Sequence, residues 1–136
     1  MKTLIIINDT PYGTEKAYNA LRIASQLGRD YKEEMELRII LMADAAKCAL
    51  AGQETPDGYY NIERMLKPSV AKGAKVKICG TCAAARGIKD SEFVKGAELS
   101  TMKELADDLG VQLVSFDKQV CREFSGFAVH PKKFVN

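Results

Sequence analysis

Two of the four cysteines, Cys79 and Cys82, stand three residues apart in the stretch KICGTCAAARGI, residues 77–88. A thiol in such a pair can act as a nucleophile, carry sulfur, or form a redox disulfide with its neighbour. Lys77 and Arg86 flank the pair, and positive charge stabilises a thiolate. If Cys79 ends a strand, the N–H groups of a following helix would stabilise the thiolate further. We therefore interpret Cys79 as the catalytic or sulfur-carrying thiol. Cys82 and Arg86 are auxiliary candidates. Cys82 either forms a redox disulfide with Cys79 or packs into the helix.

The remaining cysteines and the single histidine limit the other chemistries of this turn. A zinc site would need two further ligands, and the chain offers no second Cys-x-x-Cys, only Cys48, Cys121 and His130. We therefore predict no metal site. His130 is also the only candidate base for a Cys-His dyad. Cys48 stands in an alanine-rich segment and is expected in the core, whereas Cys121 could be a second exposed thiol.

Residues that follow the first two predicted strands are candidates to line a pocket near Cys79. The loop NDTPYGTE, residues 8–15, lacks the repeated glycines and the lysine of nucleotide-binding loops, so we expect no cofactor. In parallel α/β sheets, ligands gather at the carboxyl ends of the strands. The pocket-lining candidates at these ends are Asn8, Tyr12, Gly13 and Asp44. A plain strand-to-helix turn would explain Tyr12 and Gly13 equally well.

The rest of the chain alternates between short apolar runs and helical patterns. In sheets built from such alternation, parallel strands are joined by helical crossovers and helices cover both faces. The predicted fold class is therefore α/β: a single three-layer α/β/α domain with a mostly parallel sheet of four to five strands. Thr14 and Asn61 are the expected N-caps of two helices. Strands are predicted at residues 3–8, 36–42, 75–78 and 111–116, with a weaker one at 94–97; helices are predicted at 14–31, at 43–52, from Asn61 to about 70 with a kink or break at Pro68, after the cysteine turn, and at 98–110.

Length, composition and charge restrict the class of protein. The 136 residues, 46% of them hydrophobic, suit one domain with its own core. The net charge of +2 is spread along the chain, so we expect no nucleic-acid partner. No apolar stretch reaches the roughly 20 residues of a membrane-spanning helix, and the N-terminus is not typical of a signal peptide. We therefore predict a cytoplasmic protein with no membrane partner, in which structural disulfides are not expected.

Four segments resemble, in this order, the DsrE/DsrF-like family: IIINDTPYGTEKAYNALRIA, LRIILMADA with the following LAGQ, GYYNIERML, and VKICGTCAAARGI. The most specific part is a cysteine seven residues before an Arg-Gly pair, here Cys79 and Arg86-Gly87. The likeness is closest to the YchN-type homo-oligomeric members, with the TusD and DsrE sulfur-relay proteins as relatives. It implies a DsrE-like α/β domain at residues 1–118 and leaves residues 119–136 as a C-terminal tail that is docked or binds a partner.

The resemblance also implies a function and an assembly. In the sulfur-relay members, the cysteine at the position of Cys79, not of Cys82, accepts sulfur as a persulfide and passes it to the next protein. Sulfur donor and acceptor proteins are then the expected partners, and a homotrimer or homohexamer is expected, with Cys79 near a subunit boundary. A second hypothesis stays open: a redox or regulatory binding module in which Cys79 and Cys82 cycle between dithiol and disulfide. The second hypothesis involves no transferase activity. For the first, it stays open whether the protein is an enzyme, as a sulfurtransferase, or only a sulfur carrier.

Overall fold

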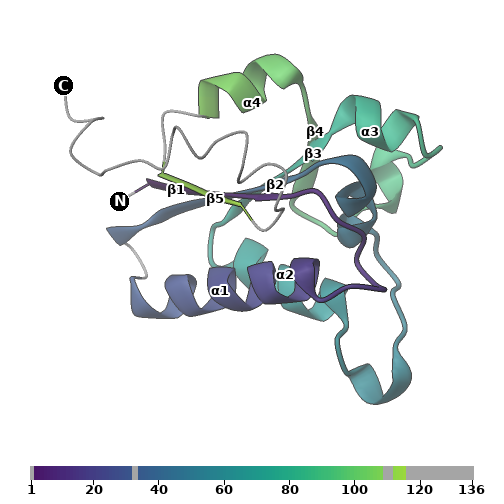
Figure 1. Ribbon diagram of the computed structural model, residues 1–136, viewed down its shortest axis with the longest axis horizontal. Coiled ribbons are helices and arrows are strands. Elements are labelled where there is room, and N and C mark those ends of the chain that lie inside the picture. Colours follow the sequence, from purple (N-terminus) through teal and green to yellow (C-terminus); the bar gives the residue numbers. More distant parts are fainter. Residues whose placement is uncertain (1, 32–33, 109–111, 116–136) are drawn as a thin grey trace.

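The computed structural model describes residues 2–31, 34–108 and 112–115, and its centre is a five-stranded sheet (Figure 1). The strand order is β4-β3-β2-β1-β5, and each neighbouring pair is parallel. Runs of isoleucine, leucine and valine favour this buried, extended structure. The strands are β1 (Lys2–Ile7), β2 (Glu36–Leu41), β3 (Lys75–Cys79), β4 (Ala97–Ser100) and β5 (Gln112–Ser115).

Helices cover both faces of the sheet and make three layers (Figure 1). The helices α1 (Lys16–Asp30) and α2 (Ile62–Ala71) lie on one face, and α4 (Met102–Asp108) lies on the other. The short helix α3 (Gly80–Ala84) follows β3 directly. The connections contain the short 3-10 helices η2 (Ala43–Ala49), η3 (Pro56–Gly58) and η4 (Asp90–Glu92). The predicted three-layer α/β/α fold with a parallel sheet is confirmed.

The main core lies between the sheet and helices α1 and α2. Ile5, Ile39 and Val76 are aligned across three neighbouring strands and are fully or almost fully buried. Small side chains of α1, such as Ala17 and Ala20, are also buried and let the helix approach the sheet closely. A second cluster on the opposite face contains Leu4, Ile6, Ile40 and Leu105. Burial on both faces explains why the strand sequences show no polar alternation.

Two predicted elements have different boundaries in the structure. The alanine-rich segment forms η2 and ends at Ala49 rather than at Gly52, because Leu50 is extended and forms an isolated bridge with Phe93. The weak strand predicted at 94–97 lies at Ala97–Ser100, since residues 93 and 94 pair with the end of η2 instead. The helix predicted at 98–110 accordingly begins at Met102. The end of that helix and the predicted domain boundary after residue 118 fall outside the described residues.

The sequence predicts a kink or break at Pro68 in α2 and helix N-caps at Asn61 of α2 and Thr14 of α1. Pro68 does not split α2, which runs unbroken to Ala71. Proline has no N–H to donate to the carbonyl of Arg64, four residues earlier. Pro68 and Arg64 are both exposed, so water can donate to that carbonyl instead. The Asn61 side chain caps α2 by accepting the Arg64 N–H at 2.9 Å, as predicted. The prediction for Thr14 is wrong by one residue: α1 begins at Lys16 and its N-cap is Glu15, which makes no side-chain cap bond. Thr14 contributes only a long contact, in which its hydroxyl accepts the Lys16 N–H at 3.4 Å.

Within residues 2–31, 34–108 and 112–115, no helix is both long enough and apolar enough to cross a membrane.

Candidate functional site

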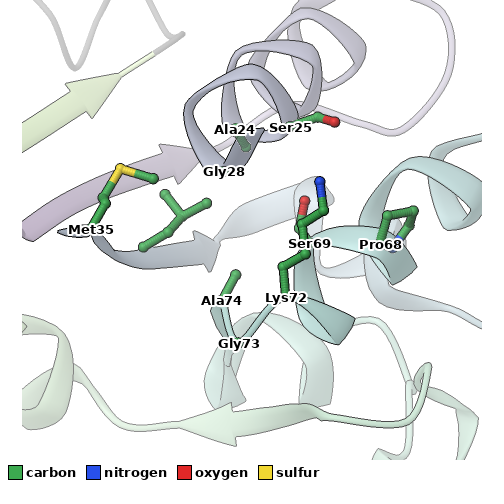
Figure 2. A pocket seen from close by; sticks show the side chains of 10 residues that line it. Ala24, Ser25, Gly28, Met35, Pro68, Ser69, Lys72, Gly73 and Ala74 are labelled. Atoms are coloured by element: carbon green, nitrogen blue, oxygen red, sulfur yellow. The ribbon is translucent and has the colours of Figure 1, made fainter. Parts of the chain in front are cut away.

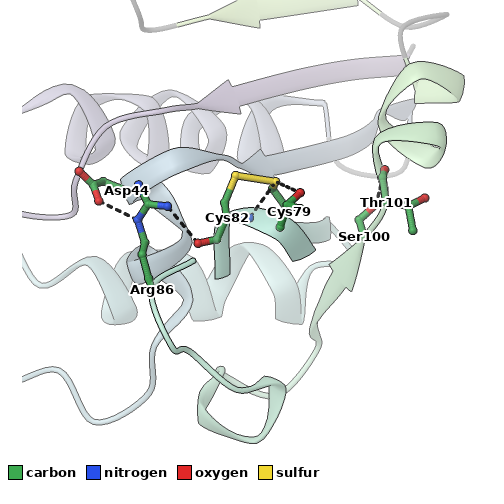
Figure 3. Close-up of a disulfide and its surroundings, with 7 residues drawn as sticks. Asp44, Cys79, Cys82, Arg86, Ser100 and Thr101 are labelled. Atoms are coloured by element: carbon green, nitrogen blue, oxygen red, sulfur yellow. Dashed lines mark hydrogen bonds and ion pairs between the residues drawn. A yellow bond between two sulfur atoms is a disulfide. The ribbon is translucent and has the colours of Figure 1, made fainter. Parts of the chain in front are cut away.

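Cys79 stands where β3 ends and α3 begins (Figure 3). It is the N-cap residue of α3, and its Sγ accepts the N–H of Cys82 at 3.3 Å. The Thr81 hydroxyl oxygen lies 3.5 Å from the same sulfur. Cys79 is only 8% exposed. A thiolate at this sulfur would therefore keep a backbone donor while most of its surface is shielded from water.

Cys79 and Cys82 are joined by a disulfide in this structure (Figure 3). Their Cα atoms are 5.2 Å apart, a usual separation for bonded cysteines. The turn therefore holds both sulfurs within reach of each other. This oxidised pair corresponds to the redox alternative considered from the sequence, and reduction is needed before Cys79 can act as a nucleophile.

Gly80 allows the cysteine turn to pass close to β4. In the sheet register, Cys79 is the partner of Ser100. A side chain at position 80 would place its Cβ 3.2 Å from the Ser100 carbonyl oxygen, which is tighter than most contacts of that kind. Glycine avoids this contact, so the first turn of α3 can lie against the neighbouring strand.

Arg86 connects two of the predicted site residues. Its Nε donates to Oδ1 of Asp44 at 2.8 Å, and its second guanidinium nitrogen donates to the Cys82 carbonyl at 3.0 Å (Figure 3). The hydrogen bond from Arg86 and the nearby charge of Lys47 lower the pKa of Asp44. The guanidinium is thus engaged on both sides, and Arg86 fixes the cysteine turn relative to the end of β2.

A polar group beside Cys79 was missed in the sequence analysis. The Ser100 hydroxyl donates to the Glu104 carboxylate at 2.6 Å, and Lys77 lies 3.8 Å from that carboxylate. The Ser100 hydroxyl and the Thr101 N–H lower the pKa of Glu104, with a further contribution from the charge of Lys77. Lys77 shares a sheet face with Cys79, two residues along β3. Recognition of Ser100 and Glu104 required the position of β4, which was predicted three residues too early.

Asn8, Tyr12 and Gly13 lie at the same edge of the sheet but are not joined to the cysteine turn. Asn8 follows β1, two strands from β3, or about 10 Å at the usual strand spacing. Its side-chain nitrogen is buried and has no hydrogen-bond partner among the described residues. The Tyr12 hydroxyl donates to Gln53 at 2.5 Å. Tyr12 and Gly13 line a separate pocket of about 250 Å³, whose described lining does not include Cys79.

The other cysteines contribute no second reactive thiol to the described site. Cys48 is fully buried, and burial, with a smaller effect of the Asp9 charge, raises the pKa of its thiol to about 12. It is a core residue, as predicted. Cys121 and His130 lie outside the described residues. In the described part of the chain, no group of three or more histidine, cysteine or acidic residues could hold a metal ion.

Sequence comparisons relate this site to known proteins. The profile of the DsrE/DsrF-like family matches residues 1–110, which include the whole cysteine turn. The protein YchN of Escherichia coli is 41% identical over 105 residues, which are 77% of this chain and 88% of that protein. An uncharacterized protein of Methanopyrus kandleri is 38% identical over 103 residues, 76% of this chain and 82% of its own length.

Solved structures show the same fold. The crystal structure of YchN from Escherichia coli matches with a TM-score of 0.79 and 37% sequence identity, over 84% of this chain and 97% of that chain. A protein of unknown function from Methanobacterium thermoautotrophicum matches with a TM-score of 0.64 over 84% of this chain and 96% of its own. Its sequence identity is 11%, so this second likeness concerns the fold alone. The family resemblance and the fold class predicted from the sequence are both confirmed.

Proposed function

Because the chain belongs to the DsrE/DsrF-like family, we propose that it is a sulfur-relay protein in which Cys79 accepts a sulfane sulfur and passes it to a thiol acceptor. The family is in general related to sulfur relay. The choice of Cys79 rests on its position seven residues before Arg86-Gly87. Sulfur donor and acceptor proteins are the partners that this function requires. A reducing compartment such as the cytoplasm suits it, because the reaction begins from a free thiolate.

One observation carries this proposal: the Cys79 sulfur lies at the carboxyl end of β3 and accepts a backbone N–H at 3.3 Å. In parallel sheets, this end of the strands is where ligands gather. The N–H group stabilises the negative charge of the Cys79 thiolate, both before it accepts sulfur and when it leaves in the transfer to the acceptor. Cys48 offers no such setting, because its thiol is buried in the core.

The proposed transfer proceeds in two displacement steps. In the first, the Cys79 thiolate attacks the outer sulfur of a donor persulfide, a Cys79 persulfide forms, and the donor leaves as a thiolate. In the second, an acceptor thiolate attacks the outer sulfur of the Cys79 persulfide, and Cys79 leaves as a thiolate. Each step breaks one sulfur–sulfur bond and forms another, so no external oxidant or reductant is consumed.

Arg86 acts in this proposal as a positioning residue. Its contacts to Asp44 and to the Cys82 carbonyl hold the turn that carries Cys79. The guanidinium is occupied by these partners, so we do not assign it to the incoming sulfur. Lys77 lies on the same sheet face as Cys79, and its ammonium is held only by a long 3.8 Å contact with the Glu104 carboxylate. We therefore assign Lys77 as the cation that stabilises the thiolate.

The disulfide favours a second candidate function, a redox or regulatory module. Cys79 and Cys82 form a bonded pair in this structure, and such a pair can exchange with a partner's dithiol or disulfide. In that exchange a thiolate of one protein attacks the disulfide of the other, a mixed disulfide forms, and the second cysteine resolves it. No sulfur atom is gained by the chain in this cycle.

Intact mass separates the two functions. The protein is reduced, freed from reductant, treated with inorganic polysulfide, desalted and weighed. Sulfur transfer predicts the gain of a single sulfur atom, which is lost on reduction and absent from Cys79→Ser. Cys121→Ser is the matched control and should load normally. A wild type that only loses two hydrogens, together with a Cys82→Ser variant that gains no sulfur, would contradict the relay function and support the redox module.

A further inference from the structure

A second pocket, drawn in Figure 2, is lined by residues at the start of β2 and directly before β3, whereas Cys79 is at the other end of β3. It is bounded by α1, by the start of β2, and by the turn between α2 and β3. Leu37 is the second residue of β2 and Ala74 directly precedes β3, whereas Cys79 is the last residue of β3. The pocket has a volume of about 420 Å³. This volume is near the lower end for small-molecule sites, so the pocket suits a small ligand.

The walls of the pocket are mostly apolar. The side chains of Ala24, Met35, Leu37 and Ala74 contribute to its lining (Figure 2). Gly28 stands on the α1 side, where a side chain would meet the stem of Lys72: an added Cβ would lie 3.9 Å from Lys72 Cδ. Apolar walls of this kind favour the hydrocarbon part of a ligand, since its burial removes apolar surface from water.

Ser69 is an unpartnered polar group on this apolar wall. The residue is 4% exposed, and its hydroxyl oxygen has no hydrogen-bond partner among the described residues. Figure 2 shows the hydroxyl pointing from α2 toward α1, across the pocket. A buried hydroxyl without a partner costs free energy, and a ligand oxygen in the pocket would satisfy it.

Lys72 adds a positive charge at the same side of the pocket. Lys72 is exposed and lines the pocket, and the hydrocarbon stem of its side chain passes near Gly28 of α1. No ion pair joins its ammonium to a carboxylate in the described part of the chain. A hydroxyl donor and an unpaired ammonium beside apolar walls are complementary to an anionic oxygen group on a short hydrocarbon body.

We propose that this pocket binds a small carboxylate with an apolar body, independently of the chemistry at Cys79. The carboxylate accepts hydrogen bonds from the Ser69 hydroxyl and the Lys72 ammonium, and the hydrocarbon lies against Ala24, Leu37 and Ala74. The pocket and the cysteine turn lie at opposite ends of β3, so ligand binding and sulfur loading can be measured separately on the same full-length chain.

Octanoate is the probe, and octylammonium and octanol are the comparison ligands of equal chain length. Methyl groups of Ala24, Leu37 and Ala74 report binding in NMR titrations, and the Ala83 methyl beside the cysteine turn is the remote reference. We expect saturable shifts at the three pocket methyls with a dissociation constant of about 1 mM. Octanoate should bind at least about fivefold more tightly than octylammonium, because only the carboxylate matches both polar groups.

Two variants test the assigned groups. Lys72→Gln should remove the preference for octanoate over octylammonium and leave octanol binding unchanged, whereas Lys95→Gln, an equal loss of charge at another exposed lysine, should preserve the preference. Ser69→Ala should weaken octanoate about threefold. Absence of saturable shifts at the pocket methyls, equal binding of the two charged ligands, or an unchanged preference in Lys72→Gln would each overturn the proposal. NMR shifts of the pocket methyls that change when the protein is diluted without ligand would also overturn the proposal. Such shifts would mean that this surface contacts a second copy of the chain.

Discussion

Arg86 is hydrogen-bonded to Asp44 at 2.8 Å, although the two residues are 42 positions apart in the sequence. The same guanidinium holds the carbonyl of Cys82 at 3.0 Å. Arg86 thereby fixes α3, which follows β3, to η2, which follows β2. In the proposed function, Arg86 would position the Cys79 sulfur through these two hydrogen bonds without contacting the sulfur itself.

Replacement of Arg86 by alanine should slow sulfur loading of reduced protein by about tenfold, because small displacements of a nucleophile reduce its rate strongly. Lys47→Ala is the matched control: Lys47 lies 3.5 Å from the same Asp44 carboxylate, whereas the side-chain hydrogen bond to the Cys82 carbonyl comes from Arg86. Its loading rate should stay within about twofold of wild type. The measurement is intact mass against time after addition of polysulfide. Equal slowing in both variants would mean that only the charge at Asp44 matters.

Cys79 in the reduced protein should react with iodoacetamide at lower pH than a free thiol, whose pKa is ~8.5. The physical reason is the Cys82 N–H at its sulfur together with Lys77 on the same sheet face. Peptide mass spectrometry after pulsed alkylation at several pH values measures the rate at each cysteine. Cys48 is the internal reference, since burial raises the pKa of its thiol to about 12. Lys77→Gln should shift the Cys79 profile to higher pH, and a profile that does not move would exclude Lys77 as the stabilising cation.

Cys82→Ser should keep a loaded sulfur for longer than wild type. In the wild type, the Cys82 thiolate can attack the Sγ of a Cys79 persulfide, which forms the disulfide and releases hydrosulfide. The disulfide that joins the two residues in this structure is the product of that attack. We expect the lifetime of the persulfide to rise at least about tenfold in Cys82→Ser.

The matched control for this lifetime is Thr81→Ala, which removes the hydroxyl 3.5 Å from the Cys79 sulfur but keeps both thiols. Its persulfide should decay at close to the wild-type rate. Loss of loading in Cys82→Ser to the same extent as in Cys79→Ser would instead favour the dithiol mechanism.

Glu36 should make stability depend on pH in the acid range. Its carboxylate accepts hydrogen bonds from Lys75 and Arg38, each at 3.0 Å or less, and these partners lower its pKa from 4.5 to about 2. Because the folded pKa is depressed, the stabilisation is complete above about pH 4.5 and is lost as the pH falls toward 2. The site is partly solvated, so we expect only about 1 kcal/mol.

Urea unfolding of wild type and Glu36→Gln at several pH values measures this contribution. The difference in unfolding free energy should be largest near neutral pH and should vanish toward pH 2. Glu98→Gln, at an exposed carboxylate of β4, is the control and should change stability little at any pH. A Glu36→Gln difference that stays constant down to pH 2 would contradict the assigned role.

We also expect a homo-oligomer, a trimer or hexamer, with a subunit boundary near Cys79. The edge strand β4 and the start of α4 expose Leu99 and Met102, 44% and 58% accessible, on either side of Ser100, the register partner of Cys79. Exposed apolar side chains beside an unpaired sheet edge are typical of contact surfaces. The C-terminal tail at residues 119–136, which is expected from the sequence to be docked or to bind a partner, lies outside the described residues.

Met102→Glu should therefore lower the molar mass measured by light scattering behind a sizing column. Ile23→Glu is the matched control, since Ile23 is 42% exposed on α1, which lies on the other face of the sheet. Its oligomer should be unchanged. A monomeric wild type would contradict the expected oligomer. An oligomer that persists in Met102→Glu would mean only that the surface of β4 and α4 is not the subunit contact.

The sequence by itself determined the type and order of most elements. Short, β-branched apolar runs, such as those containing Ile5 and Ile39, are typical of strands that are covered on both faces. These runs alternate with helical patterns, and strands joined by helical crossovers pair in parallel, as β1 and β2 do. Asn61 could be predicted as a cap because its partner, the Arg64 N–H, is three residues away. Cys79 could be singled out because a strand end, a Cys-x-x-Cys pair and an Arg-Gly pair coincide within a few residues.

Only the tertiary structure decided what surrounds Cys79. Strand register places Ser100 beside it and sheet order brings Asp44 to Arg86, while Tyr12 and Gly13 line a different pocket. These neighbours come from segments far apart in the chain, and a shift of a few residues in one strand boundary, as at β4, changes which side chain is opposite the cysteine. Local propensity sets the elements, but register and strand order follow from packing of the whole sheet, and a site that draws on several strands is defined only once that packing is complete.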